Sequence, residues 1–317
     1  MSCVNLRASV SSFALGVVVI GALGVRLIQP AAPPQLPAPP LRLTPSEISI
    51  YRSAQTLIDW TPRQVRDSPL LYKLRPPASP DQLPTILQHV GETITHLFQT
   101  FPTIACDEEV FSESGPWTPH ITNLHTLRYI VIPHTDGDAP AFEEYRTDLK
   151  GKPLGVKSLR DLHMITADFA STWLYLSPED QQNSHFRYFG TQSMRNRECH
   201  VVGFAQDPER ARSGGGFFTQ GQSIVVLVQG LAWIDSESFQ VLRINTWLLA
   251  PRGDIGLTSQ DSTVDFYPVQ PSGFRGVLWL PRDVKVEIVY RGAGVRNTHQ
   301  YSNFKLFRVE STIKPAG

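Results

Sequence analysis

An excess of charge of either sign is absent from this sequence. Its 317 residues include 29 Lys and Arg and 29 Asp and Glu, so the formal net charge at pH 7 is zero. Proteins that bind nucleic acids normally carry a basic excess that neutralises phosphates, and the balance here argues against that class. Charged residues make up only 18% of the chain and hydrophobic residues 41%, which permits a folded core and argues against disorder of the whole chain.

Patterns of metal ligands are also missing. His120 and His125, five positions apart, are one possible pair, but HExxH does not occur, and Cys106 and Cys199, two of the three cysteines, are 93 positions apart and supply no second pair. Structural zinc sites use cysteine or histidine pairs with spacings of roughly two to five residues. We therefore predict no metal and no cofactor.

The signatures of common enzymes are missing too. Gly214–Gly216 precede two phenylalanines and an expected strand, whereas a phosphate-binding loop opens a helix; a flexible hairpin loop is the expectation there. The pairs Glu108-Glu109 and Glu143-Glu144 lie in expected strands, where neighbouring side chains point to opposite faces. We interpret them as solvated strand charges and predict that the chain is not an enzyme.

An uncharged segment is present near the amino terminus. Arg7 is the only charged residue among the first 25, and the uncharged stretch from Ala8 to Val25 is closed by Arg26. A basic start followed by a short apolar stretch is typical of a secretory signal, but about 18 uncharged residues also reach membrane-spanning length. We predict export to the periplasm, with residues 1–29 as either a cleaved signal peptide or a signal anchor in the inner membrane.

Proline is abundant in the first quarter of the chain, with 13 of the 26 prolines before residue 85. The densest run falls in residues 30–45. Proline at this density favours an extended polyproline II conformation. We interpret residues 30–45 as a semi-rigid linker that holds the folded part away from a membrane; a ligand for a proline-recognition domain is the alternative.

Two helices are predicted in a helical segment over residues 46–101. The first covers Ser46–Trp60. The second is expected to be capped by Asp81, to tolerate Pro84 in its first turn and to end at Pro102. Its apolar residues recur at helical spacing: Leu83, Ile86, Leu87, Val90, Ile94, Leu97 and Phe98.

Residues 102–317 carry the pattern of a β domain. The expected strands are Cys106–Glu113, Asn123–Pro133, Phe142–Leu149, Phe186–Met194, Glu198–Gln206, Ser223–Ile234, Phe239–Leu249, Thr263–Gln270, Val277–Leu280 with Val284–Tyr290, and Tyr301–Ile313. Many strands joined by hairpin-length connections predict an antiparallel meander. The predicted fold class is mainly β within α+β: a curved antiparallel sheet or incomplete β-barrel covered by helices and preceded by a helical segment.

One helix is expected to interrupt the strands, between Val156 and Ser177, and to stop at Ser177-Pro178. Its apolar residues are Leu159, Leu162, Met164, Ile165, Phe169, Trp173, Leu174 and Leu176. A helix packed on one face of a sheet needs an apolar arc of about 100°, and this arc is wider. Part of the helix is therefore expected to contact something other than the exterior of the sheet.

Cys106 and Cys199 are predicted to form a disulfide, because an even pair of cysteines in an exported protein is normally oxidised. Closing a loop of 93 residues would stabilise the fold by roughly 4–5 kcal/mol in the chain-entropy model. Two buried free thiols are the alternative.

Several motifs between residues 100 and 313 resemble exported bacterial proteins related to the lipoprotein carriers LolA and LolB. Phe101–Glu108 resembles the start of their sheet, and Tyr301–Phe307 their last strand. Gly230–Asp235 followed by Phe239–Ile244 is similar to their "G-x-x-W-I-D … x-V-x-R-I" hairpin, and Val264–Val269 with a later Leu-Pro to their "V-x-F-x-x-V … L-P" segment. The W-I-D hairpin is the most specific of these motifs.

The resemblance implies an incomplete, strongly bent antiparallel barrel that is covered by helices and encloses an apolar cavity for acyl chains. The residues expected to line that cavity are Phe169, Trp173, Leu174, Trp233, Trp247 and Phe266. Trp173 is expected either to close the cavity mouth or, if the helix of Leu83–Phe98 packs over it, to lie in a dry core.

Two functions are compatible with these observations. The first is a non-enzymatic envelope protein that binds an apolar or lipidated ligand, such as an acyl chain or a lipidated protein. The second is a protein-interaction or envelope-stress sensing module on the same fold, which would keep its amino-terminal membrane anchor. The mass of the native amino terminus distinguishes them, because only a freely diffusing carrier must lose residues 1 to about 24, the end of a signal peptide.

Overall fold

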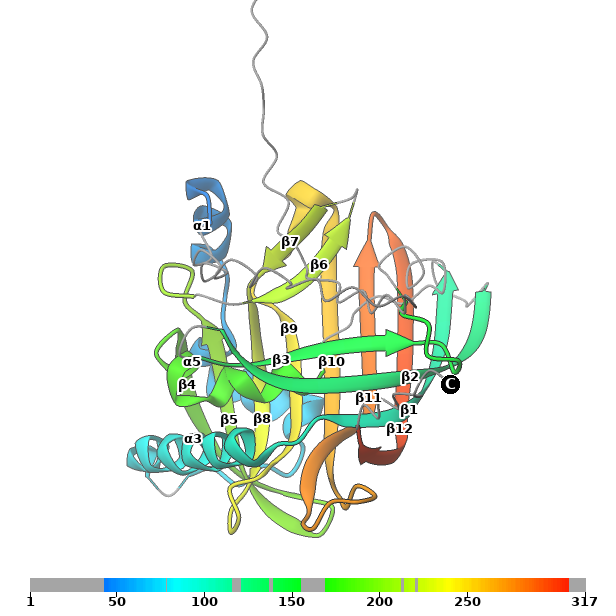
Figure 1. Ribbon diagram of the computed structural model, residues 1–317. Helices are drawn as coiled ribbons and strands as arrows, with labels where there is room; N and C mark the ends of the chain where they lie inside the picture. The colour runs from blue at the N-terminus through cyan, green and yellow to red at the C-terminus, as the bar shows by residue number, and fades with distance from the viewer. Residues whose placement is uncertain are drawn as a thin grey trace, which may run out of the picture. The chain divides into compact units, whose positions relative to one another are not determined.

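A ten-stranded antiparallel sheet forms the body of the computed structural model (Figure 1). Its spatial order is β3-β2-β1-β12-β11-β10-β9-β8-β5-β4. The strands are β1 (Ile104–Gly115), β2 (Ile121–Asp136), β3 (Ala139–Thr147), β4 (Ser184–Met194), β5 (Arg197–Gln206), β8 (Val228–Asp235), β9 (Val241–Leu248), β10 (Leu257–Val269), β11 (Leu278–Tyr290) and β12 (Ala293–Leu306). The curved, open antiparallel sheet with helices over it confirms the predicted fold class.

The structure describes residues 43–77, 79–115, 121–136, 139–154, 169–211, 214–219 and 222–307. The predicted signal segment, and the predicted linker except for residues 43–45, lie outside these ranges. All described residues belong to one compact unit, Pro37–Gly317. Among them, no helix has both the length and the apolar composition needed to cross a membrane.

Several expected strand boundaries are wrong. β10 begins at Leu257 rather than Thr263, and β12 begins at Ala293 rather than Tyr301. The glycine-rich segment expected to be a loop contains β6 (Gly215–Thr219), which pairs with β7 (Gln222–Val226) in a separate two-stranded sheet. The expected strand Ser223–Ile234 is therefore two strands, β7 and β8. The two short strands expected between Val277 and Tyr290 are the single strand β11, Leu278–Tyr290. Pro281 pairs with Phe266 at a β-bulge, where a missing backbone N–H is tolerated.

The amino-terminal helical segment is more broken than expected. The helix predicted over Ser46–Trp60 is α1 (Pro45–Arg52), closed at its start by a capping box of Thr44 and Glu47, and is followed by the 3-10 helix η1 (Leu57–Asp59). Further along are α2 (Pro62–Asp67), η2 (Pro69–Leu71) and η3 (Pro80–Gln82). Prolines at the first positions of these short helices fit the fixed φ of proline to a helix start.

The long helix α3 (Leu83–Thr100) forms where the apolar periodicity predicted it, with a proline in its first turn. The expected capping by Asp81 is wrong. Gln82 is the capping residue and makes no side-chain capping bond, while the Asp81 carboxylate accepts a hydrogen bond from the Ser79 hydroxyl.

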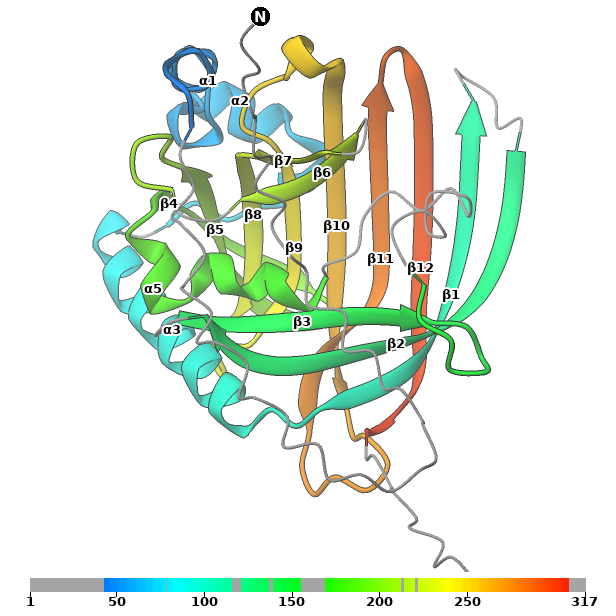
Figure 2. The ribbon, with the colours of Figure 1, turned by 45° about the horizontal axis from the view of Figure 1, so that its top comes forward.

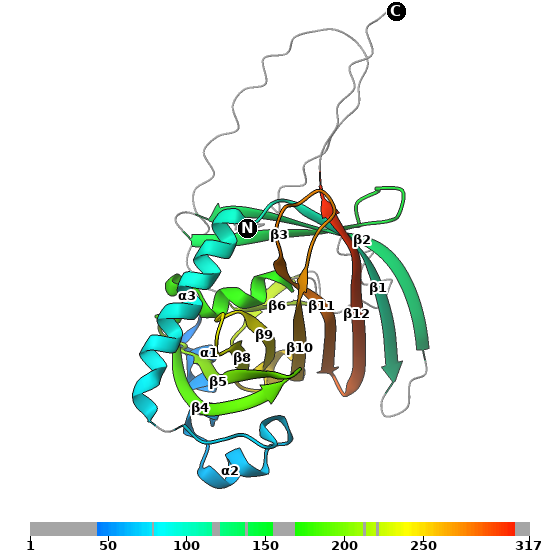
Figure 3. The ribbon, with the colours of Figure 1, turned by 90° about the horizontal axis from the view of Figure 1, so that it is seen from below.

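Strand alternation gives the sheet two apolar faces. In β8, for example, Ala232 and Ile234 belong to the main core, whereas Leu231 and Trp233 belong to a second cluster on the other face. The concave face is covered by α3, by the 3-10 helix η4 (Ala170–Leu176) and by α5 (Pro178–Gln181) (Figure 2). Viewed from below, α2 lies outside the arc of β4, β5, β8 and β9, on their convex side (Figure 3).

The convex face is covered by the amino-terminal segment. Leu57 and Leu71 are buried against Phe189 and Trp233, and Tyr51 is buried with Leu227 in a third small cluster. The buried Arg252 fixes α1 to the sheet side, donating hydrogen bonds to Glu47 Oε1 at 3.0 Å and to Tyr51 Oη at 3.0 Å. The segment that precedes the sheet in sequence therefore belongs to the same folded body.

The predicted disulfide is wrong: Cys106 and Cys199 are both free and buried. Cys106 lies in β1 and Cys199 in β5, and five strands separate these two. At about 4.8 Å per strand, the path along the curved sheet between them is roughly 30 Å, whereas the residues of a disulfide must lie within about 7 Å of each other. Cys106 also belongs to the main core and Cys199 to the cluster on the other face.

Candidate functional site

An aromatic cluster fills the concave face beneath η4. The ring of Trp173 packs against Phe142 at 5.3 Å, Phe266 at 5.7 Å and Phe101 at 5.9 Å between centroids. Trp173 is only 3% exposed, and Ile86, Val90 and Ile94 of α3 belong to the same core. Of the two arrangements expected for Trp173, the structure has the one in which α3 covers it.

The six residues expected to line a cavity fall into two groups. Phe169, Trp173 and Phe266 are buried together on the concave face, with Leu174 packed against them. Trp233 and Trp247 belong to the cluster on the convex face. The sheet brings four of the six residues together and separates them from the other two.

The expected helix between Val156 and Ser177 is described only from Phe169 onward. Its end is the 3-10 helix η4, and Ser177 then caps the new helix α5, whose first residue is Pro178. The residues before Phe169 lie outside the described ranges. Because 3-10 hydrogen bonds have poorer geometry than α-helical ones, η4 relies on contacts with its surroundings.

Glu144 of β3 holds the start of η4. Its carboxylate accepts hydrogen bonds from the backbone N–H of Phe169 at 2.8 Å, the backbone N–H of Ser171 at 3.1 Å and the Ser171 hydroxyl at 2.9 Å. It also accepts one from the hydroxyl of Tyr129. A carboxylate at the amino-terminal end of a helix satisfies N–H groups that have no partner within the helix, so β3 fixes the position of the cover.

A buried ionic network lies beside this cluster. Glu108 of β1 accepts a bidentate pair of hydrogen bonds from Arg146 of β3, at 2.7 and 3.0 Å. The same carboxylate accepts from Tyr301 Oη at 2.8 Å and from His299 Nδ1 at 2.9 Å, both on β12. Glu108 and His299 have no exposed surface. Four donors on one carboxylate supply the compensation that a buried charge requires.

Aromatic rings connect the network to the cover. The Arg146 guanidinium lies 4.9 Å from the Tyr129 ring centroid and 5.6 Å from that of Phe169, within the range of cation–π attraction. The edge of Phe169 meets the His299 ring at 4.8 Å. The residue just before η4 therefore contacts the network directly.

The network shifts the pKa values of its members. Burial alone would raise the pKa of Glu108, but the Arg146 guanidinium and the His299 imidazole lower it to about 2. Burial lowers the pKa of His299 below its usual value, and this outweighs the opposing effect of Glu108. Burial also raises the pKa of Tyr301 well above 10. Near neutral pH the network is therefore an ionised Glu108–Arg146 pair with a neutral histidine.

This network was not predicted from the sequence. The interpretation of Glu108 as a solvated strand charge is wrong, because it faces the concave side, while Glu109, which follows it, is exposed. The same interpretation is wrong for Glu144, because its carboxylate accepts hydrogen bonds from Phe169 and Ser171 at the start of η4. One signal was available: Cys106, Glu108 and Val110 alternate in a strand, which places the carboxylate on the same face as two apolar residues.

The shifted pKa values predict acid-sensitive stability. The unfolded chain takes up a proton at His299 near the usual pKa of 6.5, and at Glu108 near 4.5, whereas the folded protein resists both protonations. Stability should therefore fall as the pH decreases below about 6.5, and again between about 4.5 and 2. Urea unfolding of the wild type and of His299→Gln between pH 7.5 and 5 measures the first loss of stability, which should be smaller in the variant. An equal loss of stability in both proteins would contradict it.

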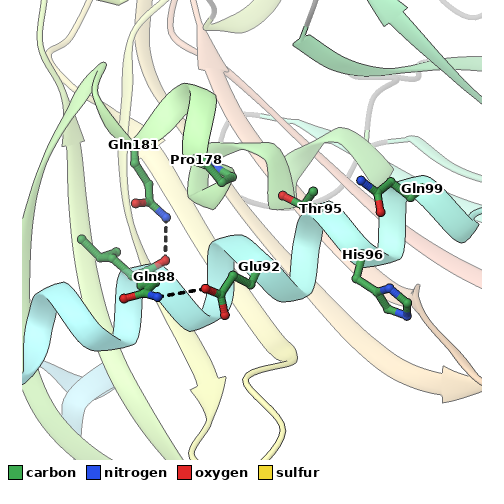
Figure 4. A pocket seen from close by; sticks show the side chains of 8 residues that line it. Gln88, Glu92, Thr95, His96, Gln99, Pro178 and Gln181 are labelled. Atoms are coloured by element: carbon green, nitrogen blue, oxygen red, sulfur yellow. Dashed lines mark hydrogen bonds between the residues drawn. The ribbon is translucent and has the colours of Figure 1, made fainter.

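A groove of about 340 Å³ runs between α3 and α5 at the margin of the cover (Figure 4). Gln181 of α5 donates hydrogen bonds to the carbonyl of Leu87 in α3 at 2.8 Å and to that of Leu176 at 2.9 Å. The helices approach closely at Gly91, where a Cβ atom would lie 3.1 Å from Pro178 Cγ. One side chain and one glycine contact thus join the two covering elements.

No cluster of three or more His, Cys, Asp or Glu suited to a metal ion occurs among the described residues. No family model and no curated protein matches the sequence.

Solved structures with a similar fold include a DUF1329 family protein from Desulfovibrio piger, with 13% identity, a TM-score of 0.40 and coverage of 74% of this chain and 96% of that chain. Another is a Vibrio parahaemolyticus domain whose name assigns it provisionally to outer membrane lipoprotein sorting, with 8% identity, a TM-score of 0.39 and coverage of 72% and 94%. A LolA superfamily protein from Nitrosomonas europaea has 11% identity, a TM-score of 0.32 and coverage of 72% and 94%. All three similarities concern the fold.

Proposed function

We propose that this protein is a non-enzymatic, exported envelope protein that binds the acyl chain of a lipid or of a lipidated protein on the concave face of its sheet. In this proposal the described structure is the closed form. The aromatic side chains of η4 occupy the place of the chain, and the chain enters when η4 and α5 move away from α3.

One observation carries the proposal: the apolar concave face is closed by separate helices rather than by a second sheet. The cover consists of α3, η4 and α5, and the last two are only seven and four residues long. They are held by a few polar contacts, chiefly those of Glu144 and Gln181. Separating η4 from the sheet breaks a small number of hydrogen bonds, each worth about 1 kcal/mol net, and exposes buried side chains such as Trp173. In the proposal the entering acyl chain replaces that lost apolar packing.

Trp173 gives a further reason to expect a second state. Among the described residues, its buried Nε1–H has no hydrogen-bond acceptor. Leaving a buried donor unsatisfied costs about 1–3 kcal/mol. Displacement of the indole towards water, or the approach of an ester or carboxylate oxygen of a lipid, would remove that cost. The closed form is thus less favourable than a fully satisfied core of the same size.

A fluorescent fatty-acid probe tests the proposal. We expect saturable binding at one site of the purified protein, with competition by unlabelled fatty acid. Glu144→Gln weakens the hydrogen bonds that this side chain accepts from the N–H groups at the start of η4. It should therefore increase the rate at which the probe associates. If the wild type shows no saturable binding of the probe, the carrier proposal is wrong, whatever the variants do.

Gln181→Ala removes the hydrogen bond between α5 and α3, which stabilises the closed position of the cover by about 1 kcal/mol. The association rate of the probe is therefore expected to increase several-fold. Gln182→Ala is the matched control, since within the described part of the chain the Gln182 amide donates to the carbonyl of Glu179 in the same turn and to nothing in α3. Stopped-flow fluorescence measures both rates. Equal rates for the two variants would show that the contact between α3 and α5 does not gate entry.

A further inference from the structure

A second cleft lies on the convex face, between the segment Pro69–Arg75 and strands β4, β8 and β9. Its volume is about 800 Å³, and it is separated from the aromatic cluster by the thickness of the sheet. Three of its lining side chains are cationic: Lys73, Arg75 and Arg243. No carboxylate is among the described residues that line it. A concave site with charges of one sign concentrates ions of the opposite sign.

The cleft is preformed. Thr191 of β4 exchanges two backbone hydrogen bonds with Arg75, at 2.8 and 2.9 Å. Gln192 donates to the carbonyl of Tyr72 at 2.7 Å and accepts from Trp233 Nε1 at 2.7 Å. The chains approach so closely that a Cβ atom on Gly190 would lie 2.0 Å from the carbonyl oxygen of Arg75, and Gly190 has a φ of +125°. The position therefore requires glycine, and the cleft does not depend on a ligand for its shape.

Cations exceed carboxylates around the cleft floor. Asp265, which is largely buried, accepts two hydrogen bonds from Arg243, at 2.9 and 2.8 Å, and one from Arg195 at 2.9 Å. One carboxylate thus serves two guanidinium groups. Arg75 is paired with Glu198 at the surface. The Arg195–Arg243 pair therefore retains one positive charge that Asp265 does not neutralise.

Lys73 adds a second positive charge at the rim. Within the described residues it has no ion-pair partner, and its Nζ lies 5.2 Å from the ring centroid of Tyr72. Its φ of 61° is in the left-handed region that a lysine rarely adopts. Beside it, Leu70 and Tyr72 are 39% and 69% exposed. The rim therefore combines a positive charge with accessible apolar surface.

We propose that this cleft binds a phosphate ester, with the phosphate between Lys73, Arg75 and Arg243 and the organic part against Leu70 and Tyr72. Arginine forks match the geometry of phosphate oxygens, and lysine contributes a point charge. The site lies on the opposite face from the acyl-chain site proposed above and goes beyond it. The phosphate can belong to a lipid headgroup or be free in solution, and the experiment separates these sources.

Isothermal titration calorimetry of the full chain tests the site with three ligands at low salt: dihexanoyl phosphatidic acid below its micelle concentration, inorganic phosphate, and uncharged dihexanoylglycerol. We expect saturable binding of the phosphatidic acid that weakens as NaCl is added, since salt screens exposed charges. Tighter binding of phosphatidic acid than of phosphate assigns the site to a lipid headgroup, and equal binding assigns it to free phosphate. Dihexanoylglycerol reports binding at the acyl-chain site alone. Binding of neither phosphate compound overturns the proposal, and so does phosphatidic acid binding that is as tight in Lys73→Gln and Arg243→Gln as in the wild type.

Two substitutions locate the site. Lys73→Gln and Arg243→Gln should each weaken binding about tenfold, the factor that corresponds to the loss of one charge-assisted contact of about 1.4 kcal/mol. Lys150→Gln is the matched control, because Lys150 is exposed and lies in the turn after β3, at the other edge of the sheet. A single cooperative melting transition shows that each variant is folded; it should be unchanged for Lys73→Gln and lower for Arg243→Gln, because the largely buried Asp265 keeps only Arg195 as a partner. Binding of the fatty-acid probe by all three variants should equal that of the wild type. Equal phosphate affinity for all three variants would overturn the assignment.

Discussion

Arg146→Met is expected to lower the free energy of unfolding by about 3–5 kcal/mol, because it leaves the Glu108 carboxylate buried without its principal counter-charge. The guanidinium has almost no exposed surface and donates two of the four hydrogen bonds that Glu108 accepts. The tyrosine and histidine that remain cannot replace a full positive charge. Urea unfolding at pH 7.5 measures the loss.

The double variant Glu108→Leu with Arg146→Met separates the cost of an unpaired charge from the value of the pair. Because desolvation offsets much of the attraction in a buried ion pair, replacing both partners should be less harmful than replacing one. Arg296→Met is the control for a surface arginine: the Arg296 side chain, which pairs with Glu287 and Glu113, is 48% exposed, and the substitution should cost about 1 kcal/mol or less. A wild-type-like Arg146→Met would contradict the description of the network.

The sheet itself could be predicted because strand alternation is a local property. Val284, Val286 and Ile288 occur at every second position, and all three are buried on one face. The helix α3 could be predicted for the same reason, since its apolar periodicity and its flanking prolines are read from neighbouring residues. The errors at Pro281 and at Gly215 concern where a strand is interrupted, which depends on bulges and on pairing partners.

The ionic network could not be predicted from local patterns. Glu108 has its partners 38 and 191 positions away, at Arg146 and His299. The pairing of β1 with β12 and, through β2, its proximity to β3 bring them together. The sequence offered many carboxylates and arginines, and no local rule selects this pair. The disulfide prediction failed for the related reason that compartment and cysteine number do not specify which strands are neighbours.

The position of Trp173 shows how a correct local observation can leave the tertiary question open. Its helix has an apolar arc too wide for one contact surface, and the described part does contact two: the sheet on one side and α3 on the other. The width of the arc was therefore informative, but it could not decide between a cavity mouth and a packed core. In the described structure Trp173 lies in a packed core.

Trp173→Ala is expected to lower the free energy of unfolding by about 3–5 kcal/mol, the usual cost of deleting a large buried side chain. The ring makes three aromatic contacts and is almost completely buried, so its removal leaves a cavity in the main core. Trp173→Phe is the matched control. It keeps an aromatic ring and removes the indole N–H that has no acceptor among the described residues, so part of its packing loss is offset by about 1–3 kcal/mol.

The same variant distinguishes a side chain that occupies the ligand position from one that forms the wall of a cavity. If the indole competes with the acyl chain, removing it should strengthen binding of the fatty-acid probe, by about tenfold for each 1.4 kcal/mol of competing packing energy that is lost. If Trp173 instead contacts the bound chain, Trp173→Ala should bind the probe more weakly than the wild type. Fluorescence titration at a temperature where the variant remains folded gives the answer. Weaker binding by folded Trp173→Ala, with Trp173→Phe unchanged, would show that the closed form already holds the ligand-binding wall and that η4 need not move.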